Sequence, residues 1–180
     1  MGAPMPSFSE LIAGAANSAV HLEMRDGYMP RDPEYTAWRS GQPVTAVIEL
    51  PEHNAWYRLV QAHAARGVRF RRARIVSEPL AEYIRFEYEM ASVLNVPAGE
   101  RLRWLPRRRA SDLCLPGNDF WLLDERLVRF SYFAGDGEHI GDELSDDPAV
   151  VNLCTSAFEA VWDLSLIHIS EPTRQAEISY

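Results

Sequence analysis

The chain has 180 residues, of which 47% are hydrophobic and 24% charged. This composition predicts a folded domain with a packed core and excludes a disordered or fibrous chain. There is no lysine, and all 18 positively charged side chains are arginine. Schiff-base chemistry, the Walker A phosphate loop and the lysine-dependent kinases are therefore excluded. The two cysteines are too few for a disulfide framework or a zinc finger, and we expect no metal and no cofactor.

Charge is distributed unevenly around a formal net value of −8. Residues 66–109 carry 11 arginines against 5 acidic residues, whereas residues 110–163 carry 2 against 12. The basic middle can face the acidic end within the fold, or it can offer a patch to a partner. The sequence shows no signal peptide and no apolar run of about 18 residues, so we expect a soluble cytoplasmic protein that contacts no membrane.

The C-terminal string LSLIHISEPTR (Leu164–Arg174), followed by QAEISY, resembles the in-frame translation of a transposase-type sequencing adapter. The alternative is a natural, isoleucine-rich tail. We predict a single globular domain over residues 1–163 and a non-native tail over residues 164–180, which we leave out of the functional interpretation.

The first elements are marked by caps and periodicity. Ser7 and Glu10 are spaced as a capping box for a helix over Phe8–Val20, which a loop follows. A short helix is expected from Pro33 to Gly41. The stretch Val44–Leu50 has strand composition without alternation and stays undecided.

A second group of elements predicts a βαβ unit. An amphipathic helix over Asn54–Arg66 precedes a strand over Val68–Val76. A helix over Pro79–Leu94 and a strand over Arg101–Leu105 follow. Strand, helix and strand with short connections favour parallel pairing and a right-handed crossover.

The last third predicts a hairpin and a helix. The hairpin is expected over Phe120–Asp124 and Leu127–Phe133. An acidic loop follows it and leads to a helix capped by Asp147. The apolar stripe of this helix includes Cys154 and Phe158. The fold class is therefore α+β, with a mixed sheet of four to five strands that contains one βαβ unit and a C-terminal hairpin, packed with helices.

Glu87 is the most informative single residue. On a helical wheel it falls within the apolar face of the helix over Pro79–Leu94. A buried carboxylate needs a partner, and strand alternation puts Arg72 and Arg74 on the side that this helix covers. We predict an ion pair between Glu87 and Arg72 or Arg74. Its structural interpretation is an ion pair within the fold, and its functional interpretation is a pocket for an anion or a polar small molecule.

Two sets of candidate site residues follow from these patterns. The candidate polar cluster or ligand-binding set is Arg72, Arg74, Glu78, Tyr83, Glu87, Arg103 and Asp124. The candidate patch for nucleic acid or another anion is Arg101, Arg107, Arg108 and Arg109. The patch lacks interleaved aromatic residues, so a solvated loop is the simpler interpretation and direct nucleic-acid binding is not expected. No catalytic residue and no metal ligand is assigned.

Several motifs carry a family resemblance, and none encodes a known chemistry. They are LE…Y (Leu22, Glu23, Tyr28), RRARIVSEPLAEYIRFE (Arg71–Glu87), N.PAGE (Asn95, Pro97–Glu100) and DFWLLDE (Asp119–Glu125). Over roughly residues 8–162 the chain resembles the actinobacterial family called domain of unknown function 6879. The resemblance implies no assigned activity, and it implies a possible partner, a helix-turn-helix regulator encoded nearby.

Three functions stay open. The first is a non-enzymatic regulatory or protein-interaction domain that acts with a helix-turn-helix transcriptional regulator. The second is a small-molecule-binding protein or hydrolytic enzyme with an Arg/Glu polar pocket, and the third is nucleic-acid binding through residues 101–109. A concave pocket that holds a carboxylate with a strongly shifted pKa would favour the second, whereas a flat, filled surface would favour the first.

Overall fold

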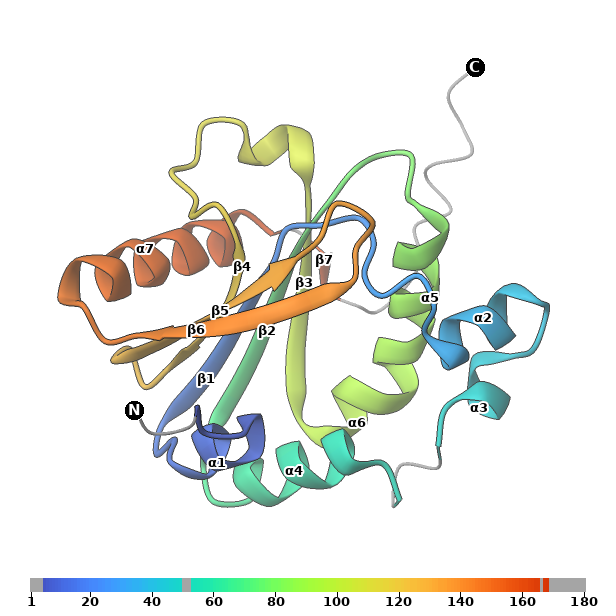
Figure 1. Ribbon diagram of the computed structural model, residues 1–180, viewed down its shortest axis with the longest axis horizontal. Helices are drawn as coiled ribbons and strands as arrows, with labels where there is room; N and C mark the ends of the chain where they lie inside the picture. Colours follow the sequence, from blue (N-terminus) through green and yellow to red (C-terminus); the bar gives the residue numbers. More distant parts are fainter. Residues whose placement is uncertain (1–4, 50–52, 166, 169–180) are drawn as a thin grey trace.

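A mixed β-sheet forms the centre of the computed structural model, which describes residues 5–49, 53–165 and 167–168 (Figure 1). The strand order is β6-β5-β4-β1-β2-β3-β7. β1, β2 and β3 are parallel, and the other pairs are antiparallel. The strands are β1 (Ser18–Glu23), β2 (Arg69–Val76), β3 (Glu100–Pro106), β4 (Asp119–Leu123), β5 (Leu127–Phe133), β6 (His139–Ser145) and β7 (Ile167–His168).

Helices cover both faces of this sheet. α7 lies across one face, where η2 also packs, and the other shorter helices gather on the opposite face (Figure 1). The helices are α1 (Phe8–Ala13), α2 (Pro33–Arg39), α3 (Val44–Val47), α4 (Ala55–Ala64), α5 (Glu82–Met90), the π-helix η1 (Ala91–Asn95), α6 (Val96–Ala98), the 3₁₀ turn η2 (Arg107–Ala110) and α7 (Pro148–Leu164). No helix within the described residues is long and apolar enough to cross a membrane.

The predicted α+β class is confirmed, and so are its two main units. β2, α5 and β3 form the parallel βαβ unit, and β4 and β5 form the hairpin. The sheet has more strands than the four to five expected. The additional strands are β1 and β6, which were not predicted, and the two-residue β7 at one edge.

β1 corrects the prediction of one helix over Phe8–Val20 and a loop after it. α1 ends at Ala13, and residues Ser18–Glu23 form a strand between β2 and β4. The alanine-rich sequence favours helix locally, but a central strand pairs its backbone on both sides and buries both of its faces. Tertiary packing therefore overrides the local preference.

β6 corrects the predicted acidic loop after the hairpin. Its residues pair antiparallel with β5 at the edge of the sheet. Asp142 accepts hydrogen bonds from Arg129 at 2.6 Å and from Ser131 at 2.8 Å, so acidic side chains of this strand are held by its neighbour. Charge on an edge strand also hinders pairing with other chains.

The remaining expectations fall close to the observed elements. The helices expected at Pro33–Gly41 and Asn54–Arg66 are α2 and α4. The undecided stretch Val44–Leu50 begins with α3, and its residue Leu50 lies outside the described residues.

The predicted tail is described only in part. Leu164 ends α7 and Ile167–His168 form β7, whereas residues 166 and 169–180 lie outside the described residues. Its origin in an adapter, and the boundary at residue 163, stay predictions.

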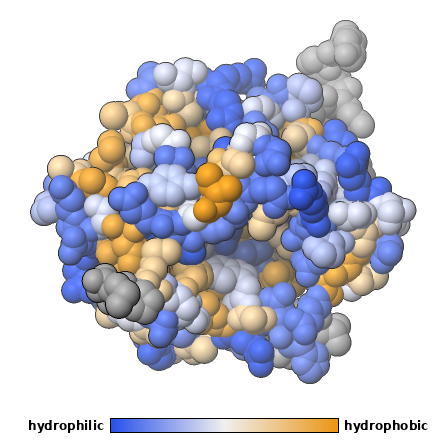
Figure 2. All heavy atoms as spheres, in the orientation of Figure 1, coloured by the Kyte–Doolittle hydropathy of each residue, from blue (hydrophilic) through white to orange (hydrophobic). Residues whose placement is uncertain are grey.

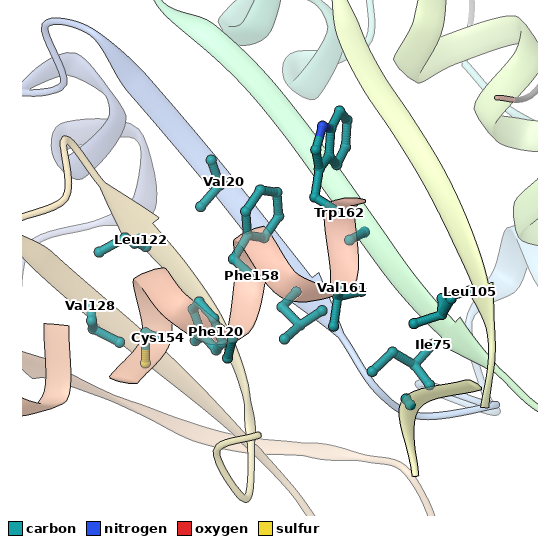
Figure 3. Close-up of a cluster of buried hydrophobic side chains, with 14 of the residues drawn as sticks. Val20, Ile75, Leu105, Phe120, Leu122, Val128, Cys154, Phe158, Val161 and Trp162 are labelled. Carbon is teal, nitrogen blue, oxygen red and sulfur yellow. The ribbon is translucent and has the colours of Figure 1, made fainter. Parts of the chain in front are cut away.

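Most of the sheet face under α7 is apolar, and Arg71 on this face pairs with Glu159 of α7. Val20 and Leu122 point from the strands toward Phe158 and Val161 of α7 (Figure 3). Phe158 and Cys154 are fully buried, as the predicted stripe requires. Burial of side chains of this size stabilises the fold by about 1.5–3 kcal/mol each.

The opposite face is divided. One apolar cluster packs under α1 and α4, around Ile12, Val60 and Phe70. A second cluster packs under α2, α3 and α5, around Tyr35, Ile84 and Phe86. Charged side chains of the central strands lie on this same face, and they form the candidate site.

Candidate functional site

Strand alternation builds the site from the sheet itself. Side chains at every second position share a face, and the register sets His21 opposite both Arg72 and Trp121. One step further along β1, Glu23 is opposite Arg74. The parallel and antiparallel neighbours of β1 thus collect charged and aromatic side chains over the middle of the sheet.

Arg74 forms the ion pair with Glu87 that was predicted from the sequence. Its Nη2 atom lies 2.5 Å from Oε2 of Glu87, and its Nε atom lies 2.7 Å from Oε2 of Glu23. Tyr83, one helical turn before Glu87 on α5, donates to the other oxygen of Glu87 at 2.6 Å. Glu87 is only 5% exposed and Arg74 only 3%, so the pair is buried.

Arg72 links two further carboxylates. Its Nη1 atom donates to Glu23 at 2.8 Å, and its Nε atom donates to Glu100 at 2.8 Å. Asn95 donates to the second oxygen of Glu100 at 2.7 Å. Asn95 stands at the end of the π-helix η1, an irregularity that is frequent at functional sites.

Asp119 begins β4 and lies beside the C-terminal end of β1. It accepts hydrogen bonds from the Tyr28 hydroxyl and from the backbone N–H of Met24. It is 3% exposed, and none of the described residues offers it an ion pair. Asp119 is therefore a buried carboxylate held by neutral donors.

Burial and neighbouring charge shift three pKa values in the site. Burial raises the pKa of Asp119 to about 6, and the negative charge of Glu23 acts in the same direction. Burial also opposes the ionisation of Glu23, but the guanidinium groups of Arg72 and Arg74 outweigh it and lower its pKa to about 2. The pKa of His21 lies well below its ordinary value because the ring is buried, so His21 is neutral at pH 7.

A cavity of about 380 Å³ opens over this network. The surface seen in Figure 2 is hollowed near its centre, with hydrophilic residues inside the hollow. Aromatic side chains form much of the wall: Tyr28, Trp56, Tyr83, Trp121 and Phe133. The charged lining consists of Glu23, Glu34, Arg72, Arg74, Glu87 and Asp119. The arrangement is suited to a small molecule that has both polar and apolar parts.

The structure brings together four of the seven residues in the predicted polar cluster, namely Arg72, Arg74, Tyr83 and Glu87. The other three lie elsewhere. Glu78 is near Arg108, with 3.4 Å between Oε2 and Nε, and Arg103 stacks on Trp162 on the α7 face. Asp124 accepts from the backbone N–H groups of residues 16–18 and holds the turn before β1.

The predicted arginine patch is engaged by the protein itself only in part, since Arg101 and Arg108 are exposed. Arg107 donates to the Ser77 hydroxyl, the Met24 carbonyl and the Asp26 carboxylate. Arg101 lies over the ring of Trp162 at 5.8 Å. The contacts of Arg107 favour a structural role for that residue, and anion binding by the rest of the patch stays a prediction.

Sequence reasoning missed several residues of the site. His21 and Glu23 were placed in a loop, Trp121 was predicted only as part of a hairpin strand, and Asp119 appeared only within the DFWLLDE motif of the family resemblance. The signal that could have found Glu23 was its spacing: His21 and Glu23 alternate with Val20 and Leu22, as in a strand with one polar and one apolar face. Within the described residues, no group of three or more His, Cys, Asp or Glu side chains is arranged to hold a metal ion.

Fold and site together define a single α+β domain with a polar, aromatic-walled cavity on one face of its sheet. The chain belongs to the family described as domain of unknown function (DUF6879), whose model matches residues 6–170. A search of curated proteins finds no match.

Two solved structures are similar to this chain over 87% of its length. TrmBL2, an archaeal chromatin protein described as showing a novel mode of DNA binding, aligns with 14% identity and a TM-score of 0.47. The alignment covers 47% of TrmBL2, so this chain spans about half of its length. Nuc, a phospholipase D family member from Salmonella typhimurium, aligns with 13% identity and a TM-score of 0.47 over 85% of its length. Because both scores are below 0.5, we infer no function from either.

Proposed function

We propose that this domain binds a small molecule without chemically transforming it, and that the cavity is the binding site. The observation that carries the proposal is the cavity of about 380 Å³ above the buried charges. Its volume falls in the usual range of ligand sites, roughly 300–1,000 Å³. If the ion-pair network served the fold alone, we would expect packed side chains to cover it. An open polar cavity removes no apolar area from water and so adds nothing to stability.

The site meets the criterion that separates a ligand site from a flat interaction surface. It is concave, and it contains Asp119, whose pKa is raised to about 6 by burial, beside Arg72, Arg74 and Glu87. Strongly shifted carboxylates in a cleft mark functional sites more often than structural ones. The geometry therefore supports ligand binding over a purely protein-interacting surface.

Binding is favoured over catalysis because the potentially reactive side chains are hydrogen-bonded to one another. Tyr83 donates to Glu87, and Tyr28 donates to Asp119. Ser131, which also lines the cavity, donates to Asp142 at 2.8 Å, but this hydrogen bond and the ion pair between Asp142 and Arg129 lower the pKa of that carboxyl group and make it a weak base. Each group already fills a structural role, and a substrate would have to displace it from its partner.

The regulatory role, the helix-turn-helix partner and the cytoplasmic location remain predictions that follow from the sequence and the family resemblance. A ligand site suits such a role, since a bound molecule can shift the affinity of a domain for its partner. Purification of the chain with its neighbouring regulator, in the presence and absence of a bound compound, would test the partnership.

A thermal-shift screen tests the binding function. The compounds are small cationic, neutral and anionic molecules, and the test variant is Met90→Trp, which fills the cavity from α5. Leu153→Trp makes a comparable change at a position that is 38% exposed on α7. We expect a concentration-dependent rise in Tm for the wild type and Leu153→Trp that Met90→Trp abolishes. If no compound raises the Tm of the wild type more than that of Met90→Trp, the proposed function is wrong.

A further inference from the structure

We propose that the ligand of this cavity is a small organic cation, an ammonium compound that also carries a hydrogen-bond acceptor and an apolar body. The inference rests on the proposed function and specifies the chemical class of its ligand. It also departs from the sequence-based interpretation of the arginines, which favoured an anion or a polar molecule.

The charge balance of the lining favours a cation. Four carboxylates line the cavity, those of Glu23, Glu34, Glu87 and Asp119, against the two guanidinium groups of Arg72 and Arg74. Glu100, fully buried behind the lining, adds a further carboxylate that binds Arg72. The only other ionisable base in the lining, His21, is neutral at pH 7 because it is buried. The lining therefore carries a net negative charge, which the nearby Arg25 and Arg129 outside the lining reduce without reversing.

The two arginines are not free to bind an anion. Arg72 spans Glu23 and Glu100, and Arg74 spans Glu23 and Glu87. An incoming carboxylate or phosphate would have to compete with these buried partners and would also approach Asp119 and Glu34. Like charges that meet in a partly buried cavity repel one another more strongly than they do in bulk water.

Two lining carboxylates lack a positive partner. Among the described residues, no arginine or histidine side chain lies within ion-pair distance of Glu34 or Asp119. Glu34 is half-buried in the first turn of α2, and the nearby Asp32, Glu87 and Glu49 help burial to raise its pKa. An ammonium group in the cavity would supply the missing positive charge.

The aromatic wall of the cavity also favours a cation. The faces of aromatic rings attract cations, and clusters of such rings recognise ammonium groups. The wall already makes such contacts within the protein: Arg72 lies over Trp121 at 5.5 Å, and Arg25 lies over Phe133 at 5.5 Å. Tyr28 and Tyr83 bring two more rings to the cavity.

The requirement for an acceptor comes from two buried donors. Nη1 of Arg74 and Nε1 of Trp56 are buried, and neither finds a hydrogen-bond partner in the described part of the chain. Both residues line the cavity. Buried donors without partners are unfavourable, so a small shift of the Arg74 and Trp56 side chains toward a hydroxyl, ether or carbonyl oxygen of the ligand would satisfy them without adding negative charge.

Three matched probes test the ligand class. 2-Amino-1-phenylethanol, 1-phenylethanol and mandelate share a phenyl ring and a hydroxyl group, but carry a cationic, a neutral and an anionic end at pH 7. Calorimetry and ligand-observed NMR on the whole chain would give the three dissociation constants. We expect the ammonium probe to bind at least 10-fold more tightly than either of the others.

One variant pair localises the effect. Glu34→Gln removes a lining carboxylate that has no cationic partner and should weaken the ammonium probe about 5-fold or more, while 1-phenylethanol changes little. Glu125→Gln, in the exposed β4–β5 turn, should leave both affinities unchanged. Circular dichroism and Tm confirm that the variants fold.

The outcomes separate the two proposals. If mandelate or 1-phenylethanol binds as tightly as the ammonium probe and Met90→Trp abolishes that binding, the cavity is a ligand site and the cation class is wrong. If Glu34→Gln leaves the affinity for the ammonium probe unchanged, the assignment of the positive charge to this part of the cavity is wrong. If none of the three probes binds at millimolar concentration and the compound screen also fails, the proposed function and the ligand class are both wrong.

Discussion

Val20 and Leu22 point from β1 toward α7, whereas His21 and Glu23, their neighbours in the chain, point to the other side of the sheet. The same strand therefore serves two different surfaces. Under α7 most of the side chains are apolar and close-packed (Figure 3). On the opposite side they are charged, and they border a cavity.

This difference separates stability from function. The face under α7 stabilises the fold by removing apolar area from water, which needs no precise geometry. The polar face gains little net stability from its ion pairs, because desolvation of buried charges offsets most of their attraction. A protein retains such a face at a cost in stability, and ligand binding gives a reason for it.

The largest expected effect comes from Phe158→Ala. Phe158 is fully buried under α7, and truncation of a buried phenylalanine costs about 3–5 kcal/mol. Urea denaturation measures the loss in unfolding free energy. At temperatures where the variant stays folded, probe affinity should be within about 2-fold of the wild type, and a larger change would show that the two faces are coupled.

Arg74→Met should cost about 3 kcal/mol or more, because it leaves Glu23 and Glu87 buried without one of their positive partners. Adding Glu87→Leu should restore part of that loss, with a coupling energy of about 0.5–3 kcal/mol. Denaturant unfolding of the single and double variants completes the cycle. Losses that simply add would mean that the pair is not the relevant contact.

The free energy of unfolding should depend on pH in the way that the raised pKa of Asp119 predicts. Its pKa rises from the ordinary 3.8 to about 6 on folding, so the folded chain holds a proton that the unfolded chain releases. This contribution, roughly 2–3 kcal/mol, is complete below about pH 4 and is lost as the pH rises through 6. Asp119→Asn should remove it.

The measurement is the unfolding free energy of the wild type minus that of Asp119→Asn between pH 4 and pH 7. The subtraction cancels the contributions of groups that both proteins share, such as the lowered pKa values of His21 and Glu23. A difference that falls with rising pH agrees with the raised pKa, and a flat difference contradicts it.

The smallest effect is expected for Arg108→Ala. Arg108 is exposed and lies 3.4 Å from the half-exposed Glu78, and exposed ion pairs contribute about 0–1 kcal/mol. Thermal unfolding should show a change in Tm of no more than about 2 °C. A large loss would show that the arginine patch supports the fold more than its exposure indicates.

Much of the fold followed from local signals, and most of the site did not. The helical wheel located Glu87 because a carboxylate within an apolar face breaks a regular pattern, and strand alternation then selected Arg72 and Arg74. Cys154 and the helix around it followed from a capping aspartate and a regular stripe.

The missed parts depend on contacts between distant segments. Glu23 and Asp119 come together only because β1 pairs with both β2 and β4, and nothing in either local sequence encodes that pairing. The cavity likewise needs the α2 region to lie beside α5, with Tyr35 and Phe86 in contact. Conversely, Asp124 and Arg103 have the right chemistry but point elsewhere, because turn geometry and strand parity set the direction of a side chain.

The most direct measurement of the central claim is a methionine methyl NMR titration. The chain has five methionines; Met29 and Met90 line the cavity, whereas Met5 is exposed away from it. On addition of 2-amino-1-phenylethanol we predict that the Met29 and Met90 methyl signals shift with one common saturation curve while the Met5 signal stays in place. Unchanged Met29 and Met90 signals at saturating probe, or equal shifts of the Met5, Met29 and Met90 signals, would contradict a ligand site on the polar face.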